Sequence, residues 1–187
     1  MRFIVKVVAM QHIINQLMAN ALGIIEHDTL PGIVARMTAD NARTINAIKH
    51  RMPNKGFIVL IPNTDWVTKL ATNVSHQARQ LMAQHWPGPL TIILNKHPQV
   101  PHAITGGRDT IALRYPNHAM LSPLLKQLNE PLLSTSANIS AQSGVSPELL
   151  KAVQFTHGNI HADGLASTIV DATGPTLRVL RQGGLLL

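Results

Sequence analysis

The sequence predicts an α/β (α+β) fold in which helices flank a mixed β-sheet. Two observations carry this prediction: short apolar runs of strand length alternate with segments of helical apolar spacing, and Gly and Pro gather in the connections. A chain of 187 residues, 45% of them hydrophobic, can bury a core without cross-links. Because no repeat, low-complexity tract or linker divides it, we expect residues 1–187 to form a single domain.

Apolar residues at helical spacing predict the helices. In the first helix Ile13, Ile14 and Leu17 share one face, and Gly23 is expected to stop it. Asp40, a residue type suited to the N-cap, is expected to open the second, which turns Ile45 inward. In chain order, the predicted helices are residues 11–21, a segment opening at 40–42, and residues 64–70, 75–85, 117–128 and 146–153.

Short apolar runs bounded by turn residues predict the strands between these helices. Residues 57–61 are typical, because the run ends at Pro62 and Asn63, which favour a turn. In chain order, the predicted strands are residues 23–25, 57–61, 90–94, 110–113, 131–133, 167–170 and 177–180.

Positive charge is concentrated in one segment. The chain has 16 Lys and Arg against 9 Asp and Glu, a net charge of +7, and between residues 36 and 55 five cations face the single acid Asp40. Such a cluster either binds polyanions or forms a solvated face. With three Phe, two Trp and one Tyr, contact with phosphates is favoured over base stacking.

Several classes of function are excluded or disfavoured by the residues present. The absence of cysteine excludes disulfides, thiolate zinc sites and cysteine nucleophiles. His157 and His161 are four residues apart, but no carboxylate completes a ligand set, so no metal site is expected. There is no Gly-rich phosphate loop, and no apolar run approaches the ~20 residues that span a bilayer. We therefore expect no membrane association and a cytoplasmic location.

Three segments place polar, basic or turn-forming residues beside apolar strands. Lys49 and Arg51 lie two apart, so on a helix they would splay, whereas at a helix-to-loop junction both can reach one phosphate chain. Spacing alone favours the simpler alternative, surface cations at a helix C-terminus. Residues 132–138 run from a buried strand into small polar residues. Their hydroxyl and amide groups favour a surface that binds a ligand over a strand end that only leads into a turn. Residues 86–91 are expected to form a rigid turn with Trp86 in the core.

Taken together, motifs in this order resemble the YrdC/TsaC family. The resemblance extends from about Gln11 to Gly183, and six motifs in order are far more specific than any one alone. The motifs are Lys49-x-Arg51, Trp86-Pro87-Gly88-Pro89-Leu90-Thr91, Ala112-Leu113-Arg114-Tyr115-Pro116, Ser134-Thr135-Ser136-Ala137-Asn138, Ser167-Thr168-Ile169-Val170-Asp171 and Leu180-Arg181-Gln182-Gly183.

The resemblance implies a specific activity. Members of the family are L-threonylcarbamoyladenylate synthases, nucleotidyltransferases that combine ATP, L-threonine and bicarbonate into threonylcarbamoyl-AMP and release pyrophosphate. Partner transferase proteins then modify the tRNA adenosine next to the anticodon. The resemblance also implies a twisted mixed sheet, a basic cavity that tRNA or other RNA can approach, and Mg²⁺ carried by the triphosphate, since few protein acids are available.

The resemblance also assigns roles to individual residues. A tetrad is implied to hold the phosphates and to catalyse the reaction: Lys49, Arg51, Ser136 and Asn138. Thr110, Gly144 and Arg181 are implied on the nucleotide side. The threonine side is implied to include Thr29, Arg114, Ser134 and Ser167. Fixed cations and donors of this kind can stabilise the charge that builds on phosphoryl oxygens without a protein nucleophile.

The chain departs from the family pattern in the first motif, which typically reads Tyr-Pro-Thr, an acid and often Thr, with an aromatic residue just before Gly. Residues 25–32 keep Asp28, Thr29 and Gly32 but lose the other elements. Two alternatives follow. One is a catalytically impaired relative that binds RNA in tRNA or ribosome maturation. The other keeps adenylate chemistry but accepts a different amino acid.

Overall fold

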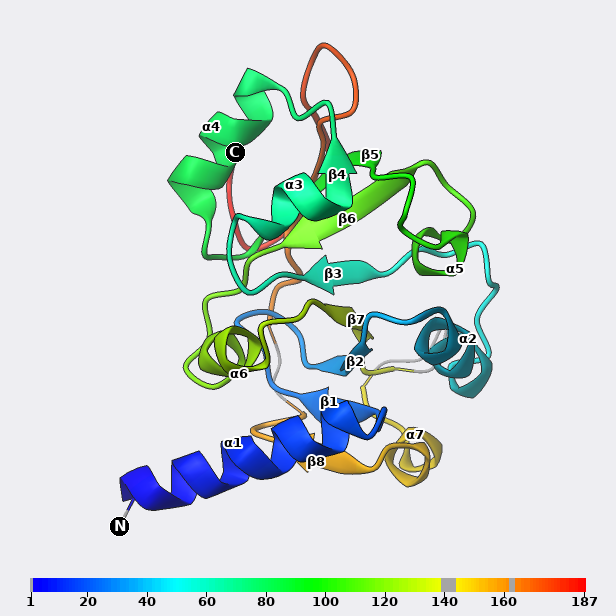
Figure 1. The fold of residues 1–187 in the computed structure, drawn as a ribbon, viewed down its shortest axis with the longest axis vertical. Helices are drawn as coiled ribbons and strands as arrows, with labels where there is room; N and C mark the ends of the chain where they lie inside the picture. The colour runs from blue at the N-terminus through cyan, green and yellow to red at the C-terminus, as the bar shows by residue number, and fades with distance from the viewer. Residues whose placement is uncertain (1, 139–143, 162–163) are drawn as a thin grey trace.

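A single mixed β-sheet organises the structure (Figure 1). The computed structural model describes residues 2–138, 144–161 and 164–187. Within these residues the strand order is β10-β9-β5-β6-β3-β7-β2-β1-β8, and β4 pairs with β5 beside this path. Parallel pairs (β1 with β8, β3 with β6, β5 with β9) occur among antiparallel ones. The predicted fold class is therefore confirmed.

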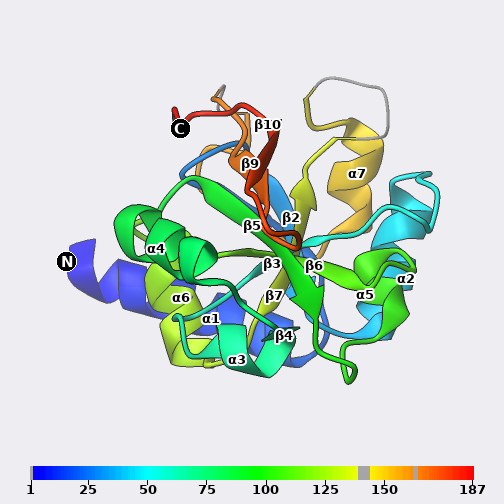
Figure 2. The same cartoon turned by 90° about the horizontal axis from the view of Figure 1, so that it is seen from above.

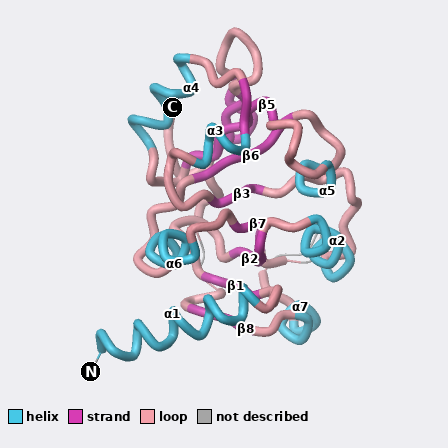
Figure 3. Tube along the Cα trace, in the orientation of Figure 1, coloured by secondary structure: helices cyan, strands magenta, loops and turns pink. Residues whose placement is uncertain are grey.

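The elements alternate along the chain, with short connections between most of them (Figure 3). The strands are β1 (Gly23–Ile25), β2 (Gly32–Arg36), β3 (Ile58–Leu60), β4 (Ala71–Thr72), β5 (Leu90–Lys96), β6 (Thr110–Arg114), β7 (Leu132–Ser136), β8 (Phe155–His157), β9 (Thr168–Asp171) and β10 (Arg178–Arg181). The helices are α1 (Arg2–Met18), α2 (Ala39–Ile48), α3 (Trp66–Leu70), α4 (His76–His85), α5 (His102–Thr105), α6 (Leu121–Leu128) and α7 (Pro147–Ala152).

Helices cover both faces of the sheet, with α2, α5 and α7 together on one side and α1 and α6 on the other (Figure 2). Successive strand residues enter different core clusters because side chains alternate across a pleated strand. Ile24 packs in the cluster that includes residues of α2 and α7, whereas its neighbour Ile25 packs with α1 and α6. Leu133 and Leu132 divide in the same way. The buried strands thus lie between the two core clusters and contribute side chains to both.

Strand β2 was missing from the sequence prediction, although it is an interior strand, paired with β7 on one side and β1 on the other. Its first four residues are buried, so it lacks the alternation of polar and apolar residues that marks a half-exposed strand. Strands β4 and β8 and helix α5 were also unpredicted, and each has only two to four residues. Runs this short carry little periodicity.

Two predicted helix ends are corrected by the structure. Thr38, and not Asp40, is the N-cap of α2, because its hydroxyl accepts a hydrogen bond from the Asn41 amide at 3.1 Å. Asp40 lies in the first turn, where its charge favours the helix dipole. The first helix ends at Met18, well before Gly23, which begins β1. A methyl group on Gly23 would lie 2.1 Å from the Phe155 ring, so this glycine serves strand packing.

No helix within the described residues has the length and apolar character needed to cross a membrane.

Candidate functional site

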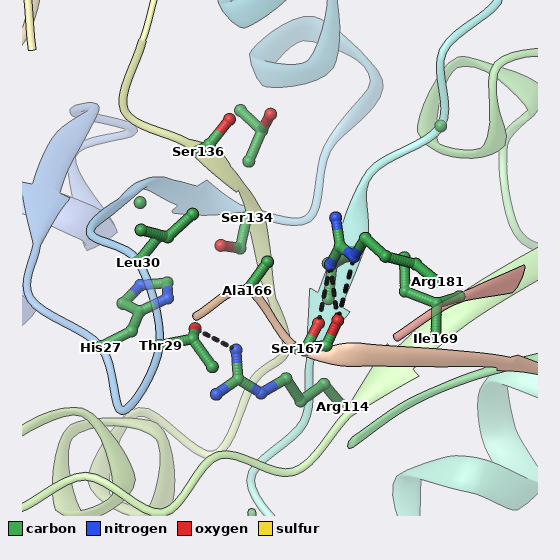
Figure 4. Close-up of a pocket in the computed structure, with 14 residues that line it drawn as sticks. His27, Thr29, Leu30, Arg114, Ser134, Ser136, Ala166, Ser167, Ile169 and Arg181 are labelled. Carbon is green, nitrogen blue, oxygen red and sulfur yellow. Dashed lines mark hydrogen bonds between the residues drawn. The ribbon is translucent and has the colours of Figure 1, made fainter. Parts of the chain in front are cut away.

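A cavity of about 260 Å³ opens where the loop after β1 meets the ends of several strands (Figure 4). The β1–β2 loop contributes His27 and Thr29, and β7 contributes its three polar residues 134–136. Pairing of Gly32 with Ser136 in the antiparallel β2–β7 ladder brings the loop and this strand end together. Arg114 comes from β6, and Arg181 from β10. Residues far apart in the sequence therefore converge on one small space.

Arg114 is almost entirely buried beside this cavity, with 3% of its side chain exposed. Its guanidinium donates to Thr29 Oγ1 at 2.7 Å and to Asp28 Oδ1 at 2.5 Å, and its Nε donates to the Gly88 carbonyl at 3.2 Å. Burial lowers the pKa of Arg114, and the charge of Asp28 opposes that shift. The two acceptors from the first motif, Asp28 and Thr29, thus hold Arg114 in place.

The turn at residues 86–91 supports Arg114 but does not itself line the cavity. Trp86 is buried, as predicted, and its indole N–H donates to the Leu90 carbonyl at 2.7 Å. The Trp86–Pro87 peptide bond is cis. Gly88 donates its amide to the Tyr115 carbonyl at 2.8 Å and offers its own carbonyl to Arg114. This motif therefore carries a structural role in placing the arginine.

Arg181 is fixed against Ser167 on the other side of the cavity. Its guanidinium donates to the Ser167 carbonyl at 2.8 and 3.0 Å and to the Ser167 hydroxyl at 3.1 Å. That hydroxyl is also 2.8 Å from the Thr91 hydroxyl. Burial lowers the pKa of Arg181, and among the described residues it has no carboxylate partner. It offers its charge to an anion that enters the cavity.

Lys49 and Arg51 reach the end of β7 from the junction after α2. Lys49 is 3% exposed, and its ammonium donates to the carbonyls of Ser136, at 2.5 Å, and Asn138. The Ser136 hydroxyl in turn donates to Asn138 Oδ1 at 2.5 Å. Desolvation, with smaller contributions from the charges of Arg51 and Lys55, lowers the pKa of Lys49 to about 8. The surface-cation alternative, which spacing alone favoured, is therefore wrong for Lys49.

Arg51 is held by a different set of contacts at the same place. Its Nε donates to Asn46 Oδ1 at 2.5 Å and its Nη1 to the Thr135 hydroxyl at 3.0 Å. The guanidinium lies 4.2 Å from the centroid of the Phe57 ring, within range of a cation–π interaction. Burial lowers its pKa to about 10, so the group remains charged near neutral pH. Lys49 and Arg51 thus converge on successive residues of β7.

The predicted site residues lie in four places. Those that line the cavity are Thr29, Arg114, Ser134, Ser136, Ser167 and Arg181. Thr110 lines a second cavity of about 480 Å³, which shares Gly56, Ile58 and Ile169 with the first. Lys49, Arg51 and Asn138 flank the β7 end without lining either cavity, and Gly144, with φ of 75°, lies apart before α7.

After the roles that the family resemblance implies, we call Lys49, Arg51, Ser136 and Asn138 the phosphate half of the site. Thr29, Arg114 and Ser167, together with His27 from the same cavity, are called the amino-acid half. Arg181, implied on the nucleotide side, lines this cavity beside Ser167. The two halves meet along β7, where Ser134 and Ser136 both line the cavity. Among the described residues, no group of three His, Asp or Glu side chains is placed to hold a metal ion.

His27 was absent from the residues assigned to the site by sequence. Its side chain lines the cavity and is buried, and its Nε2 has no hydrogen-bond partner among the described residues. Burial, helped by the charge of Arg114, lowers the pKa of His27 to about 3, against the opposing charge of Asp28. Its position in the sequence could have indicated it, because His27 occupies the place of the threonine in the Tyr-Pro-Thr motif of the family.

Comparison with known proteins identifies the family of this chain. The Sua5, YciO and YrdC family, described as "Telomere recombination", matches residues 15–183. The chain belongs to this family, and the resemblance seen in its motifs is confirmed.

Two curated relatives carry the name threonylcarbamoyl-AMP synthase. The protein from Pyrococcus abyssi is 33% identical over 169 residues, which cover 86% of this chain and 49% of the relative. The protein from Chromobacterium violaceum is 32% identical over 145 residues, covering 74% of each. The chain thus spans about half the length of the Pyrococcus relative.

Solved structures match the fold over nearly the whole chain. Sua5 from P. abyssi in complex with L-threonine superposes with a TM-score of 0.87 at 27% identity, covering 94% of this chain and 54% of that one. YciO from E. coli superposes with a TM-score of 0.81 at 22% identity, covering 94% and 89%. At that identity the YciO match supports the fold alone.

Proposed function

We propose that this chain is an L-threonylcarbamoyladenylate synthase that makes threonylcarbamoyl-AMP and pyrophosphate from ATP, L-threonine and bicarbonate. The observation that carries the proposal is the junction of the two halves along β7. The buried Lys49, held at Ser136 and Asn138, and the half-buried Arg51, held at Thr135, adjoin a cavity lined by Arg114 and Arg181. The names of the relatives, and the threonine complex of the Pyrococcus structure, support the same reaction.

The reaction needs positioning and charge stabilisation more than it needs a protein nucleophile. The threonine amine and bicarbonate combine into a carbamate with loss of water, and a carbamate oxygen then attacks the α-phosphorus of ATP. The bond between the α-phosphorus and the bridging oxygen breaks, and pyrophosphate leaves. Negative charge on the phosphoryl oxygens is stabilised by the Lys49 ammonium, the Arg51 guanidinium and the Ser136 hydroxyl.

Binding of the triphosphate favours the charged form of Lys49. An anion beside this ammonium opposes the desolvation that lowers its pKa to about 8. Lys49 would then exchange part of its contact with the β7 carbonyls for contact with phosphate oxygens. The adjoining cavity with Thr110 gives space for the rest of the nucleotide, and Mg²⁺ arrives with ATP as part of the substrate.

Arg181, which the resemblance implies on the nucleotide side, is proposed to contact phosphate oxygens from the edge of the cavity that it shares with the threonine-side residues. It lies beside Ser167 and faces across the cavity toward the β1–β2 loop (Figure 4). Arg114 keeps Thr29 at the cavity wall, and Ser134 supplies a hydroxyl from the floor. Gly144 and Asn138 are proposed to border the nucleotide from the loop after β7.

The proposal includes a role in tRNA modification. The product would pass to a tRNA threonylcarbamoyl-transferase for the adenosine next to the anticodon, in the cytoplasm. The net charge of +7 is suited to the approach of RNA, and it also motivates the alternative of an impaired RNA-binding relative. The names of the relatives do not favour that alternative.

Pyrophosphate release tests the proposal directly. Purified protein is given ATP, bicarbonate and Mg²⁺ with and without L-threonine, and the adenylate is identified by mass spectrometry. We expect threonine-dependent release, reduced by Arg51→Ala and unaffected by the exposed-site control Lys126→Ala. ATP binding without release under any amino acid, or RNA binding without ATP binding, would overturn the assignment.

A further inference from the structure

The cavity has two chemically different ends (Figure 4). Arg181 and Ser167 form a charged end on one side, and His27 lies on the other beside Leu30. Arg114 lies between them, but its charge is already paired with Asp28 at 2.5 Å. A ligand bound between these ends therefore meets a charged group at one end and His27 at the other.

His27 presents a buried polar atom that nothing in the described structure satisfies. The residue is 7% exposed, and its Nε2 lacks a hydrogen-bond partner among the described residues. Such an atom costs free energy in the folded state, so it is usually paired or has a function. Because the ring lines the cavity, a ligand there can provide the partner.

The ring is held in place by close packing. A methyl group added to Gly32 would lie 2.7 Å from His27 Cε1, 3.2 Å from Nε2 and 3.0 Å from the Ser134 hydroxyl oxygen. Nε2 and the Ser134 hydroxyl therefore flank the bare α-carbon of Gly32. This leaves a polar pair on one wall, opposite the charged end.

Two other roles for His27 fit the observations less well. A general base for the threonine amine would need a pKa near the working pH, whereas burial and Arg114 lower the pKa of His27 to about 3. A metal ligand would need further ligands, and no cluster of three exists in the described part of the chain. The uncharged imidazole remains suited to one hydrogen bond with a neutral group.

We propose that His27 is a specificity-determining residue, whose Nε2 forms a hydrogen bond with the side-chain hydroxyl of the bound amino acid. A hydroxyl both donates and accepts, so it satisfies Nε2 in either tautomer of the ring. The inference rests on the proposed function, since it takes L-threonine as the occupant. It assigns to this histidine the selection of a hydroxyl-bearing amino acid over one without it.

Calorimetry in the presence of ATP tests this assignment with two ligands, L-threonine and L-2-aminobutyrate, which lacks the hydroxyl. We expect the wild-type protein to bind threonine roughly 100-fold more tightly, because 2-aminobutyrate leaves the buried Nε2 without a hydrogen bond. In His27→Leu the ratio should fall below about tenfold. His27→Gln, which keeps a polar group, should retain most of it, as should the control His12→Leu on the exposed face of α1.

A second readout does not depend on any variant folding. In protein labelled with ¹⁵N-histidine, the Nε2 resonance of His27 should move on addition of threonine and stay in place on addition of 2-aminobutyrate. If threonine binds but neither the resonance nor the binding ratio responds, the role of His27 is wrong and the synthase proposal stands. If threonine does not bind with ATP present, both proposals are overturned.

Discussion

The two halves of the site differ in how completely their polar groups are satisfied. In the phosphate half, Lys49 and Arg51 donate to carbonyl, amide and hydroxyl oxygens of the β7 end and its neighbours. In the amino-acid half, Arg114 is equally well held, but His27 Nε2 has no partner among the described residues. The half whose motifs match the family is internally bonded, and the divergent motif contributes the unsatisfied atom.

This difference has a physical meaning for catalysis and for selection. Groups that stabilise developing charge work best when they are fixed before the substrate arrives, because no reorganisation is then needed. A group that selects a ligand gains most when it is unsatisfied until the correct ligand binds. The phosphate half fits the first requirement, and His27 fits the second.

Replacement of Arg114 by Leu should break the amino-acid half most severely. It leaves the Asp28 carboxylate, whose side chain is 13% exposed, without its cation. We expect the free energy of unfolding to fall by about 3–5 kcal/mol in urea denaturation. The exposed pair of Arg43 with Asp40 provides the control, since Arg43→Leu should cost less than about 1 kcal/mol. Equal losses in the two variants would show that Arg114 does not anchor the loop.

Replacement of Lys49 by Ala tests the phosphate half. Removal of one fixed donor from developing charge typically costs about 10²–10³-fold in rate, and we expect a decrease of this size in pyrophosphate release. The increase in melting temperature caused by ATP should also disappear. Lys126→Ala, at an exposed position on α6, is the matched control. An unchanged ATP shift in Lys49→Ala would place the triphosphate elsewhere.

A methyl group at Gly32 probes the boundary between the halves. Because it would meet His27 Cε1 at 2.7 Å, Gly32→Ala should overpack the wall and lower stability by about 1–3 kcal/mol. Threonine binding should weaken while ATP binding is kept. The double variant with His27→Ala should recover part of the stability loss, as measured in a double-mutant cycle. Additive losses would argue against contact between the two positions.

The acid dependence of stability should reveal His27. Its pKa falls from 6.5 in the unfolded chain to about 3 in the folded state, so the unfolded chain binds the proton more readily between these values. Stability is therefore lost as pH falls from 6.5 toward 3, with a contribution from this group of at most about 1.4 kcal/mol per pH unit. His27→Leu should show a shallower loss in denaturation curves at pH 7, 6, 5 and 4. The same slope in both proteins would mean that folding does not lower the pKa of His27.

Much of the fold was predictable because its signals are local. Apolar runs of strand length predicted β3, β5 and β6 within a few residues, and helical spacing predicted α4. Strand β2 was missed because it is buried on both faces, and the N-cap was assigned two residues late because Thr38 and Asp40 are both good cap residues. In both cases the local sequence is compatible with more than one structure, and packing against distant segments determines which one forms.

The sequence by itself determined the fold class, the family and most of the polar residues that meet at the cavity, because the spacing and order of motifs are encoded along the chain. Only the tertiary structure decided that Lys49 is buried at the β7 end and that Thr110 lies in a neighbouring cavity. It also decided that Nε2 of His27 is enclosed without a partner among the described residues. Burial and hydrogen-bond partners depend on segments distant in sequence, so no local pattern specifies them.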